Sequence, residues 1–189
     1  MKPVILLQTD FSLTWGAVAS VKGVIKQVDP TLEIEDLCHD IRKFDPWEAS
    51  LSLGTVVPYW PAGTIVVSVV DPGVGTDRKA CVALLQNGTY VITPDNGTLT
   101  HLKHGIGIKA VRELDPSKLP EGWTLAYDLS VPTCRSLNQP YDPSNPTTQY
   151  YSIDGLILSP NVKMLEVKTI DKGFENSDHN PVQLRFVLN

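Results

Sequence analysis

The sequence predicts an α/β protein: a mainly parallel sheet flanked by helices in the N-terminal part, followed by a short all-β C-terminal segment. Up to about Asp115, apolar runs typical of buried strands alternate with apolar residues at helical spacing. Beyond it, three short strand patterns follow without a helix between them, and eight of the fifteen prolines lie in 116–189. We therefore expect two parts, 1–115 and 119–189, with different architectures.

The first elements form a strand, helix, strand unit. Val4–Leu7 is an apolar run typical of a buried strand. From Ala17 to Val28 the apolar residues fall at helical spacing, and Asp29-Pro30 ends the pattern. Leu32–Leu37 is the second predicted strand.

A second helix and a central strand follow. Asp45-Pro46-Trp47-Glu48 has an N-cap residue, a proline at the first helical position and a glutamate at the third, which predicts a helix that runs to about Val57. The β-branched run from Ile65 to Val70 predicts a strand buried on both faces, and it ends at Asp71-Pro72-Gly73.

The remaining predicted elements are strands. Cys81–Leu85 and Tyr90–Thr93 flank Asn87-Gly88, a strong signal for a hairpin, and Ile108–Leu114 is a further strand. Pro140–Thr148 is rich in turn residues. Three strands are predicted beyond it, the last half-buried because its apolar residues alternate: Tyr151–Leu158, Met164–Thr169 and Val182–Leu188.

Composition narrows the function classes. The net charge of −5 and the lack of a Lys/Arg cluster argue against nucleic acid and against an anionic membrane as partners. No apolar stretch reaches the length of a membrane span or of a signal-peptide core, so we expect a cytoplasmic protein. Cys38, Cys81 and Cys134 contain no Cys-x-x-Cys pair, which predicts small core residues rather than disulfides or a zinc site.

Two carboxylates mark the candidate site. Asp10 follows the first strand and Asp71 the central one, and the carboxyl ends of parallel strands open into the same crevice. A carboxylate can accept two hydrogen bonds from a ribose diol, so this pair suits a ligand rich in hydroxyl groups. Arg78 returns a positive charge near Asp71. The alternatives are a cap or turn role for Asp10 and an ordinary Pro-Gly turn after Asp71.

Other polar and aromatic residues in these loops have two interpretations each. Asn96 can bind a nucleobase edge or hold its own turn, and the turn is the default. Phe44 and Trp47 can stack on an adenine, although aromatic residues at a helix start more often pack in the core. His39 is expected to be structural.

Taken together, the motifs identify a family. Five segments agree in order and spacing: QTDFSLTWG, VASVKGVI, HDIRKFDPWEA, VVDPGVGTDR and TPDNGTLT. Over about residues 3–115 they resemble the S-adenosyl-L-methionine hydroxide adenosyltransferases, the family that also contains the fluorinase and chlorinase. The resemblance implies cleavage of S-adenosyl-L-methionine at C5′ of its ribose by water or hydroxide, giving adenosine and methionine, with no cofactor.

The resemblance also implies roles for single residues. Asp71 and Arg78 would position and activate the attacking water, and Asp10 would hold the ribose hydroxyls. Phe44 falls where the family places an aromatic residue beside the substrate, and Asn96 lies in a loop that helps to line the pocket. The resemblance also implies a homo-oligomer, which in that family is a trimer.

Three features depart from that family's pattern. Trp15 stands where members usually carry an acidic residue that recognises the methionine part. No segment like FHGRD, which carries the family's catalytic histidine, follows Asp115. The separate C-terminal β domain that closes the pocket from a neighbouring subunit is also missing from the sequence.

The C-terminal segment has a different pattern. PTCR, PYDP, YSIDG and NSDHNPV resemble the last strands of the endonuclease/exonuclease/phosphatase superfamily over about residues 119–189. That resemblance implies Mg²⁺-dependent cleavage of phosphoesters, with His179 contacting the scissile phosphate, Asp154 orienting His179 and Asp178 at the metal. The superfamily's other metal-binding and catalytic residues would all lie N-terminal to this segment, where the chain carries adenosyltransferase-like sequence.

Three hypotheses about function follow. The favoured one is an S-adenosyl-L-methionine hydrolase that forms adenosine. The alternatives are an Mg²⁺-dependent phosphoesterase or nuclease-like hydrolase, and a non-catalytic fusion or truncation product that at most binds a nucleoside. Release of adenosine and methionine, Mg²⁺-dependent phosphodiester cleavage, or binding without turnover would distinguish them.

Overall fold

The computed structural model describes residues 2–74, 78–115, 119, 121–135, 142, 144 and 150–189. The chain divides into two compact units, Met1–Leu114 and Asp115–Asn189. Gly75, in the loop between Asp71 and Arg78, and most of the predicted turn-rich stretch, 140–148, lie outside the described residues. In the part of the chain that is described, no helix is long and apolar enough to cross a membrane.

The N-terminal unit is built on one sheet. Within the described residues it has six strands: β1 (Val4–Thr9), β2 (Glu33–Cys38), β3 (Ile65–Val69), β4 (Ala80–Leu85), β5 (Tyr90–Pro94) and β6 (Ile108–Glu113). They lie in the order β2-β1-β3-β5-β4-β6. Strands β2, β1, β3 and β5 are mutually parallel, and β4 runs antiparallel to both of its neighbours. The predicted mainly parallel sheet is therefore confirmed, and so is the hairpin across Asn87-Gly88.

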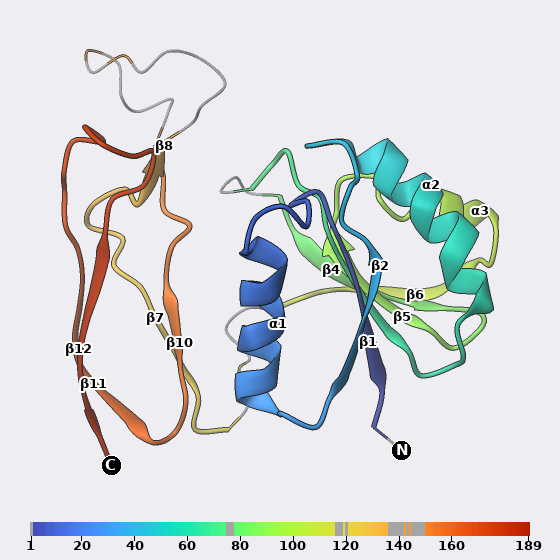
Figure 1. The fold of residues 1–189 in the computed structure, drawn as a ribbon, viewed down its shortest axis with the longest axis horizontal. Helices are drawn as coiled ribbons and strands as arrows, with labels where there is room; N and C mark the ends of the chain where they lie inside the picture. Colours follow the sequence, from blue (N-terminus) through green and yellow to red (C-terminus); the bar gives the residue numbers. More distant parts are fainter. Residues whose placement is uncertain are drawn as a thin grey trace. The chain divides into compact units, whose positions relative to one another are not determined.

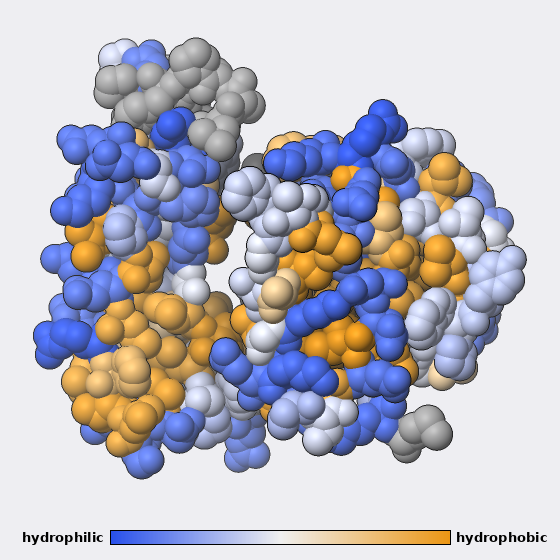
Figure 2. Space-filling model, in the orientation of Figure 1, coloured by the Kyte–Doolittle hydropathy of each residue, from blue (hydrophilic) through white to orange (hydrophobic). Residues whose placement is uncertain are grey.

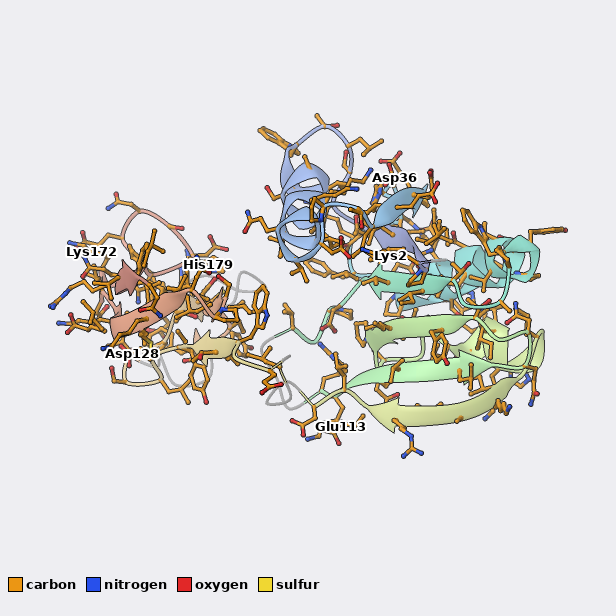
Figure 3. All side chains as sticks on the ribbon, turned by 90° about the horizontal axis from the view of Figure 1, so that it is seen from below. Lys2, Asp36, Glu113, Asp128, Lys172 and His179 are labelled. Carbon is orange, nitrogen blue, oxygen red and sulfur yellow. The ribbon has the colours of Figure 1, made fainter. Side chains whose placement is uncertain are left out.

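Helices cover both faces of this sheet. They are α1 (Ala17–Val28), α2 (Pro46–Val56), the 3-10 turn η1 (Val57–Tyr59) and α3 (Thr100–His104). The chain crosses from β1 to β2 through α1 and returns past β1 to β3 through α2, so right-handed crossovers put the two helices on opposite faces. Figures 1 and 3 show α1 on one side and α2 with α3 on the other. Helix α3 was not predicted, because five residues are too few to show a helical period.

The core lies between the sheet and the α2–α3 face. Eight fully buried side chains form it: Leu6, Leu53, Val57, Val66, Ala83, Leu85, Val91 and Leu102. The prediction that the central strand is buried on both faces is wrong in part. On β3, Val66 and Ser68 are fully buried, whereas Ile65, Val67 and Val69 keep some exposure. The second face is covered less completely because Val18 is the only buried residue among those of α1.

Close packing joins α2 to α3. Ser50 Oγ accepts a hydrogen bond from His101 N at 2.9 Å and lies 3.0 Å from His101 Nδ1. The Trp47 and His101 rings meet edge to face with centroids 4.6 Å apart. Gly54 faces His101, and a Cβ placed on it would lie 2.9 Å from His101 Cβ. The absence of a side chain at Gly54 therefore permits this approach.

Among the described residues of the C-terminal unit, the strands form three antiparallel pairs. They are β7 (Thr124–Ala126) with β10 (Leu156–Leu158), β8 (Cys134–Arg135) with β9 (Tyr150–Tyr151), and β11 (Val162–Thr169) with β12 (Val182–Leu188). The predicted strand from Tyr151 to Leu158 is instead split into β9 and β10. Its middle leaves the sheet because Thr133 Oγ1 accepts the backbone N–H groups of Ile153 and Asp154.

The β11–β12 pair has one apolar face. Met164 pairs with Phe186 and Val162 with Leu188, and residues directly opposite share a face. The sequence predicted a half-buried strand, and the first half of β12 fits. In the C-terminal half of β12, Phe186 and Leu188 are 49% and 67% exposed, so this half does not fit the prediction. Figure 2 shows apolar surface over this end of the pair.

Candidate functional site

The predicted site residues of the N-terminal unit lie at one edge of its sheet. Asp10 directly follows β1, Asp71 lies two residues after β3, and Asn96 lies two residues after β5. These three strands are adjacent and parallel, so their carboxyl ends meet at the same edge. His39 directly follows β2 at that edge. Loops from four neighbouring strands therefore supply the site.

Asp71 and Arg78 form an ion pair within the loop after β3. The Arg78 Nη2 group donates to Asp71 Oδ2, and Asp71 Oδ1 accepts from Gly73 N at 3.0 Å. The two side chains are only 8% and 22% exposed. The carboxylate is thus held by a positive neighbour and by its own turn, with little water around it, where electrostatic effects on a reacting molecule are strong.

Asp10 connects the loop after β1 to the segment before α2. It is 8% exposed, and its Oδ2 accepts a hydrogen bond from Phe44 N at 2.8 Å. Phe44 has a φ of 61°, an uncommon backbone angle for an aromatic residue, and the residue is 61% exposed. The bond to Asp10 thus holds Phe44 in a conformation that leaves its ring at the surface.

Asn96 uses its side chain to brace the backbone. Its Nδ2 donates to Val70 O at 2.9 Å, and its Oδ1 accepts from Thr98 Oγ1 at 2.6 Å and from Thr98 N at 3.3 Å. The amide therefore holds its own turn, and it also ties the loop after β5 to the end of β3.

A buried histidine supports the same edge. His39 Nδ1 lies 2.9 Å from Thr9 Oγ1, and its Nε2 lies 3.0 Å from Asp36 Oδ1. Asp36 also pairs with Lys22. Burial raises the pKa of Asp36, but the hydrogen bonds from Lys22 and His39 outweigh it and leave the pKa lowered. His39 has the structural environment that the sequence suggested.

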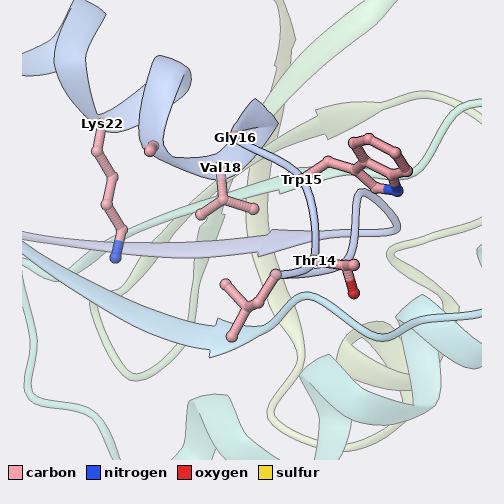
Figure 4. Close-up of a pocket in the computed structure, with 7 residues that line it drawn as sticks. Thr14, Trp15, Gly16, Val18 and Lys22 are labelled. Carbon is pink, nitrogen blue, oxygen red and sulfur yellow. The ribbon is translucent and has the colours of Figure 1, made fainter.

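Trp15 lies in the loop between β1 and α1. It is 77% exposed and lines an open hollow of about 320 Å³ together with Leu13, Thr14, Gly16, Val18, Ala19 and Lys22. Figure 4 shows this hollow between the loop and the first turns of α1. Its walls are mainly apolar, and the charged residue among them, Lys22, pairs with Asp36.

The C-terminal candidate residues lie in the second unit. His179 Nδ1 is 2.8 Å from Asp154 Oδ2, and the side chains are 43% and 35% exposed. The backbone oxygen of Asp178 accepts from Arg135 N at 2.9 Å. Among the described residues, no group of three His, Cys, Asp or Glu side chains is arranged to hold a metal ion.

The sequence analysis did not predict the contact between Cys134 and His179 in this unit. Its Sγ lies 3.6 Å from His179 Nε2. Burial raises the pKa of the Cys134 thiol, and the carboxylates of Asp178 and Asp154 raise it further. The residues that separate Cys134 from Asp154 and His179 in sequence hid this proximity, because only the strand pairing brings them together.

Comparison with known proteins agrees with the N-terminal geometry. Residues 5–131 match the model of the SAM hydroxide adenosyltransferase N-terminal domain. The match thus runs beyond residue 115, where the sequence analysis placed the end of the resemblance.

Among curated proteins, the chain is similar to (R)-S-adenosyl-L-methionine hydrolases. It is 34% identical over 119 residues to the one from Methanocaldococcus jannaschii, covering 61% of this chain and 45% of that protein. It is 45% identical over 100 residues to the one from Thermus thermophilus, covering 53% and 38%. The fluorinase of Nocardia brasiliensis is 25% identical over 144 residues, covering 64% and 48%.

A solved structure gives the same result. A conserved protein from Thermotoga maritima superposes with a TM-score of 0.58 at 38% identity, covering 59% of this chain and 43% of that one. The chain spans less than half the length of each of these relatives. With more than half of its residues matched by the domain model, the chain belongs to the SAM hydroxide adenosyltransferase family.

Proposed function

We propose that the N-terminal unit binds S-adenosyl-L-methionine and hydrolyses it at C5′ of the ribose, releasing adenosine and methionine. The observation that carries this proposal is the Asp71–Arg78 pair at the carboxyl edge of the sheet, nearly removed from water. The curated relatives at 34% and 45% identity that bear the hydrolase name support it.

The reaction needs an oriented nucleophile more than an acid. The sulfonium sulfur already carries a positive charge, so it leaves as a neutral thioether when the C5′–S bond breaks. A water aligned opposite that bond forms the new C5′–O bond and loses a proton. Asp71 would orient this water and receive the proton, and Arg78 would stabilise the negative charge on the carboxylate or on hydroxide.

Asp10 and its neighbours would hold the nucleoside. One lone pair of Asp10 Oδ2 is used by Phe44 N, and the carboxylate keeps further lone pairs for the two ribose hydroxyls. The exposed Phe44 ring would then contact the adenosyl group. We propose that Asn96 lines the pocket through its loop while its amide holds the turn.

The open edge of the sheet leaves room for a neighbouring protein surface. We propose that the chain forms a homo-oligomer in which a second copy adds surface to the pocket. Light scattering with and without 1 mM adenosine would report a ligand-dependent oligomer.

The test is product analysis. Purified protein is incubated with S-adenosyl-L-methionine, and adenosine and methionine are quantified by chromatography. Asp71→Asn keeps the shape of the side chain but removes the charge, so we expect release to fall by roughly 10²–10⁴-fold, as for loss of a proton acceptor. Arg78→Lys is the corresponding conservative substitution in the residue that pairs with Asp71. Absence of product with the unchanged protein would overturn the hydrolase proposal, and adenosine binding alone would then support a non-catalytic nucleoside-binding product.

A second candidate rests on the C-terminal unit. The Asp154–His179 hydrogen bond is the pairing expected of a histidine that contacts a scissile phosphate in a phosphoesterase. Asp178, the residue expected at Mg²⁺, neighbours it in sequence. Cleavage of bis-p-nitrophenyl phosphate that requires Mg²⁺ and is lost in His179→Ala would support this candidate, and activity that survives the substitution would refute it.

A further inference from the structure

A third side chain extends the Asp154–His179 pair. Cys134 Sγ lies 3.6 Å from His179 Nε2, while His179 Nδ1 lies 2.8 Å from Asp154 Oδ2. A carboxylate only accepts hydrogen bonds, so the proton of the neutral imidazole lies on Nδ1 and Nε2 presents its lone pair to the thiol. Thiol, imidazole and carboxylate therefore form one directed chain of proton donors and acceptors.

Backbone pairing fixes the distance between the thiol and the imidazole. Cys134 and His179 form an antiparallel bridge. On either side of it, Arg135 N donates to Asp178 O at 2.9 Å and Asn180 N donates to Thr133 O at 2.8 Å. The two side chains thus project from adjacent, hydrogen-bonded backbones, and their approach does not depend on two mobile surface rotamers.

Buried polar side chains hold Asp154 and the backbone on either side of the Cys134–His179 bridge. Thr133, which is fully buried, accepts the N–H groups of Ile153 and Asp154 at 2.9 and 3.0 Å. Asn180, 3% exposed, donates to Pro132 O at 3.0 Å. Buried hydrogen-bonded side chains of this kind specify one arrangement.

His179 Nε2 faces the thiol and can take its proton directly, although burial and the carboxylates of Asp178 and Asp154 raise the pKa of that thiol. A histidine that contacts a phosphate needs Nε2 open, whereas here Cys134 faces that atom. The thiol hydrogen has a second acceptor, because the sulfur also lies 3.4 Å from Arg135 O. Cys134 is 8% exposed, and the side chain of His179 beside it is 43% exposed.

We propose that Cys134, His179 and Asp154 form a nucleophilic thiol site that attacks small activated acyl compounds, such as esters and thioesters. Sulfur would bond to the carbonyl carbon as the thiol proton passes to His179 Nε2. The bond to the leaving group then breaks, and the leaving group receives that proton. Water attacks the resulting thioester, which releases the acid and restores the thiol. Asp154 would stabilise the imidazolium that exists between these steps.

The test measures the reactivity of individual cysteines in the full chain. Protein in EDTA is treated with limiting iodoacetamide, and peptide mass mapping gives the alkylation rate of each cysteine. Cys81 is the internal control, because it is 4% exposed and, within the described part of the chain, forms no hydrogen bond with a histidine. We expect Cys134 to react at least about 10-fold faster than Cys81, since general-base assistance contributes roughly 10²–10⁴-fold.

Variants distinguish activation of Cys134 by His179 and Asp154 from reactivity that is due to solvent exposure alone. His179→Ala should bring the Cys134 rate down to that of Cys81, and Asp154→Asn should give an intermediate rate. With p-nitrophenyl acetate, an acetyl adduct should form on Cys134 and be absent in Cys134→Ser. Equal rates for Cys134 and Cys81 in the unchanged protein would overturn the proposal. So would a Cys134 rate that is unaffected by both His179→Ala and Asp154→Asn in folded protein.

Discussion

The contact between α2 and α3 makes a sharp prediction about two glycines in helices. Gly54 of α2 faces His101, and an added Cβ would lie 2.9 Å from His101 Cβ, closer than real Cβ contacts come. Gly23, in the middle of α1, has nothing within 4 Å of the same position. Alanine at either site gains about 0.5–1 kcal/mol of helix propensity.

At Gly54, the overlap with His101 decides whether alanine stabilises or destabilises the protein. His101 Cβ sits next to the backbone, so relief requires α3 to move, which strains both hydrogen bonds between His101 and Ser50. Overpacking of this kind costs about 1–3 kcal/mol. We therefore expect Gly23→Ala to stabilise the protein and Gly54→Ala to be about 1–3 kcal/mol less stable than Gly23→Ala.

Urea unfolding followed by tryptophan fluorescence measures this difference. Three of the four tryptophans, Trp15, Trp47 and Trp60, belong to the N-terminal unit, so the signal reports mainly on the unit that carries both glycines. A shift of the midpoint at constant slope identifies a change in stability. If Gly54→Ala gains as much stability as Gly23→Ala, the packing argument for α2 and α3 is wrong.

Three further predictions concern single carboxylates. Asp45→Ala removes the side chain that caps α2 and should cost about 0.5–2 kcal/mol of unfolding free energy in urea; no loss would show the cap to be idle. Since Lys22 and His39 lower the pKa of folded Asp36, its contribution to stability is complete above the unfolded pKa of about 4 and is lost as pH falls through the folded value. The stability of the unchanged protein should thus fall more steeply below about pH 4 than that of Asp36→Asn, and parallel curves would contradict this. Asp10→Asn should weaken adenosine binding by about 10–100-fold in calorimetry, because hydrogen bonds to a charged group contribute roughly 1.5–3 kcal/mol; unchanged affinity would remove Asp10 from the nucleoside site.

Local patterns were sufficient for the N-terminal fold. The bounds of α1 and the start of α2 agree with the sequence because capping residues and helical spacing act over a few positions. The C-terminal unit was harder to predict. The break between β9 and β10 comes from a Thr133 hydroxyl about twenty positions away, and no local pattern reports such a bond.

In the candidate site, too, features set by local patterns were predicted, and contacts between distant residues were not. Strand order alone placed Asp10 and Asp71 at one edge, and a single loop brought Arg78 back to Asp71. The sequence did not reveal that Asp10 holds Phe44 N, since that contact spans 34 positions. It also treated Cys134 as a core residue, because a thiol beside a histidine is apparent only once distant strands pair.

The Asn96 brace has a consequence for engineering. The Asn96 amide joins the loop after β5 to Val70 O, the last carbonyl before Asp71, so the loops after β3 and β5 are structurally coupled. Transplanting either loop alone into a relative would break that link and leave a carbonyl without its donor. Exchanges that alter ligand preference at this edge should therefore move both segments together.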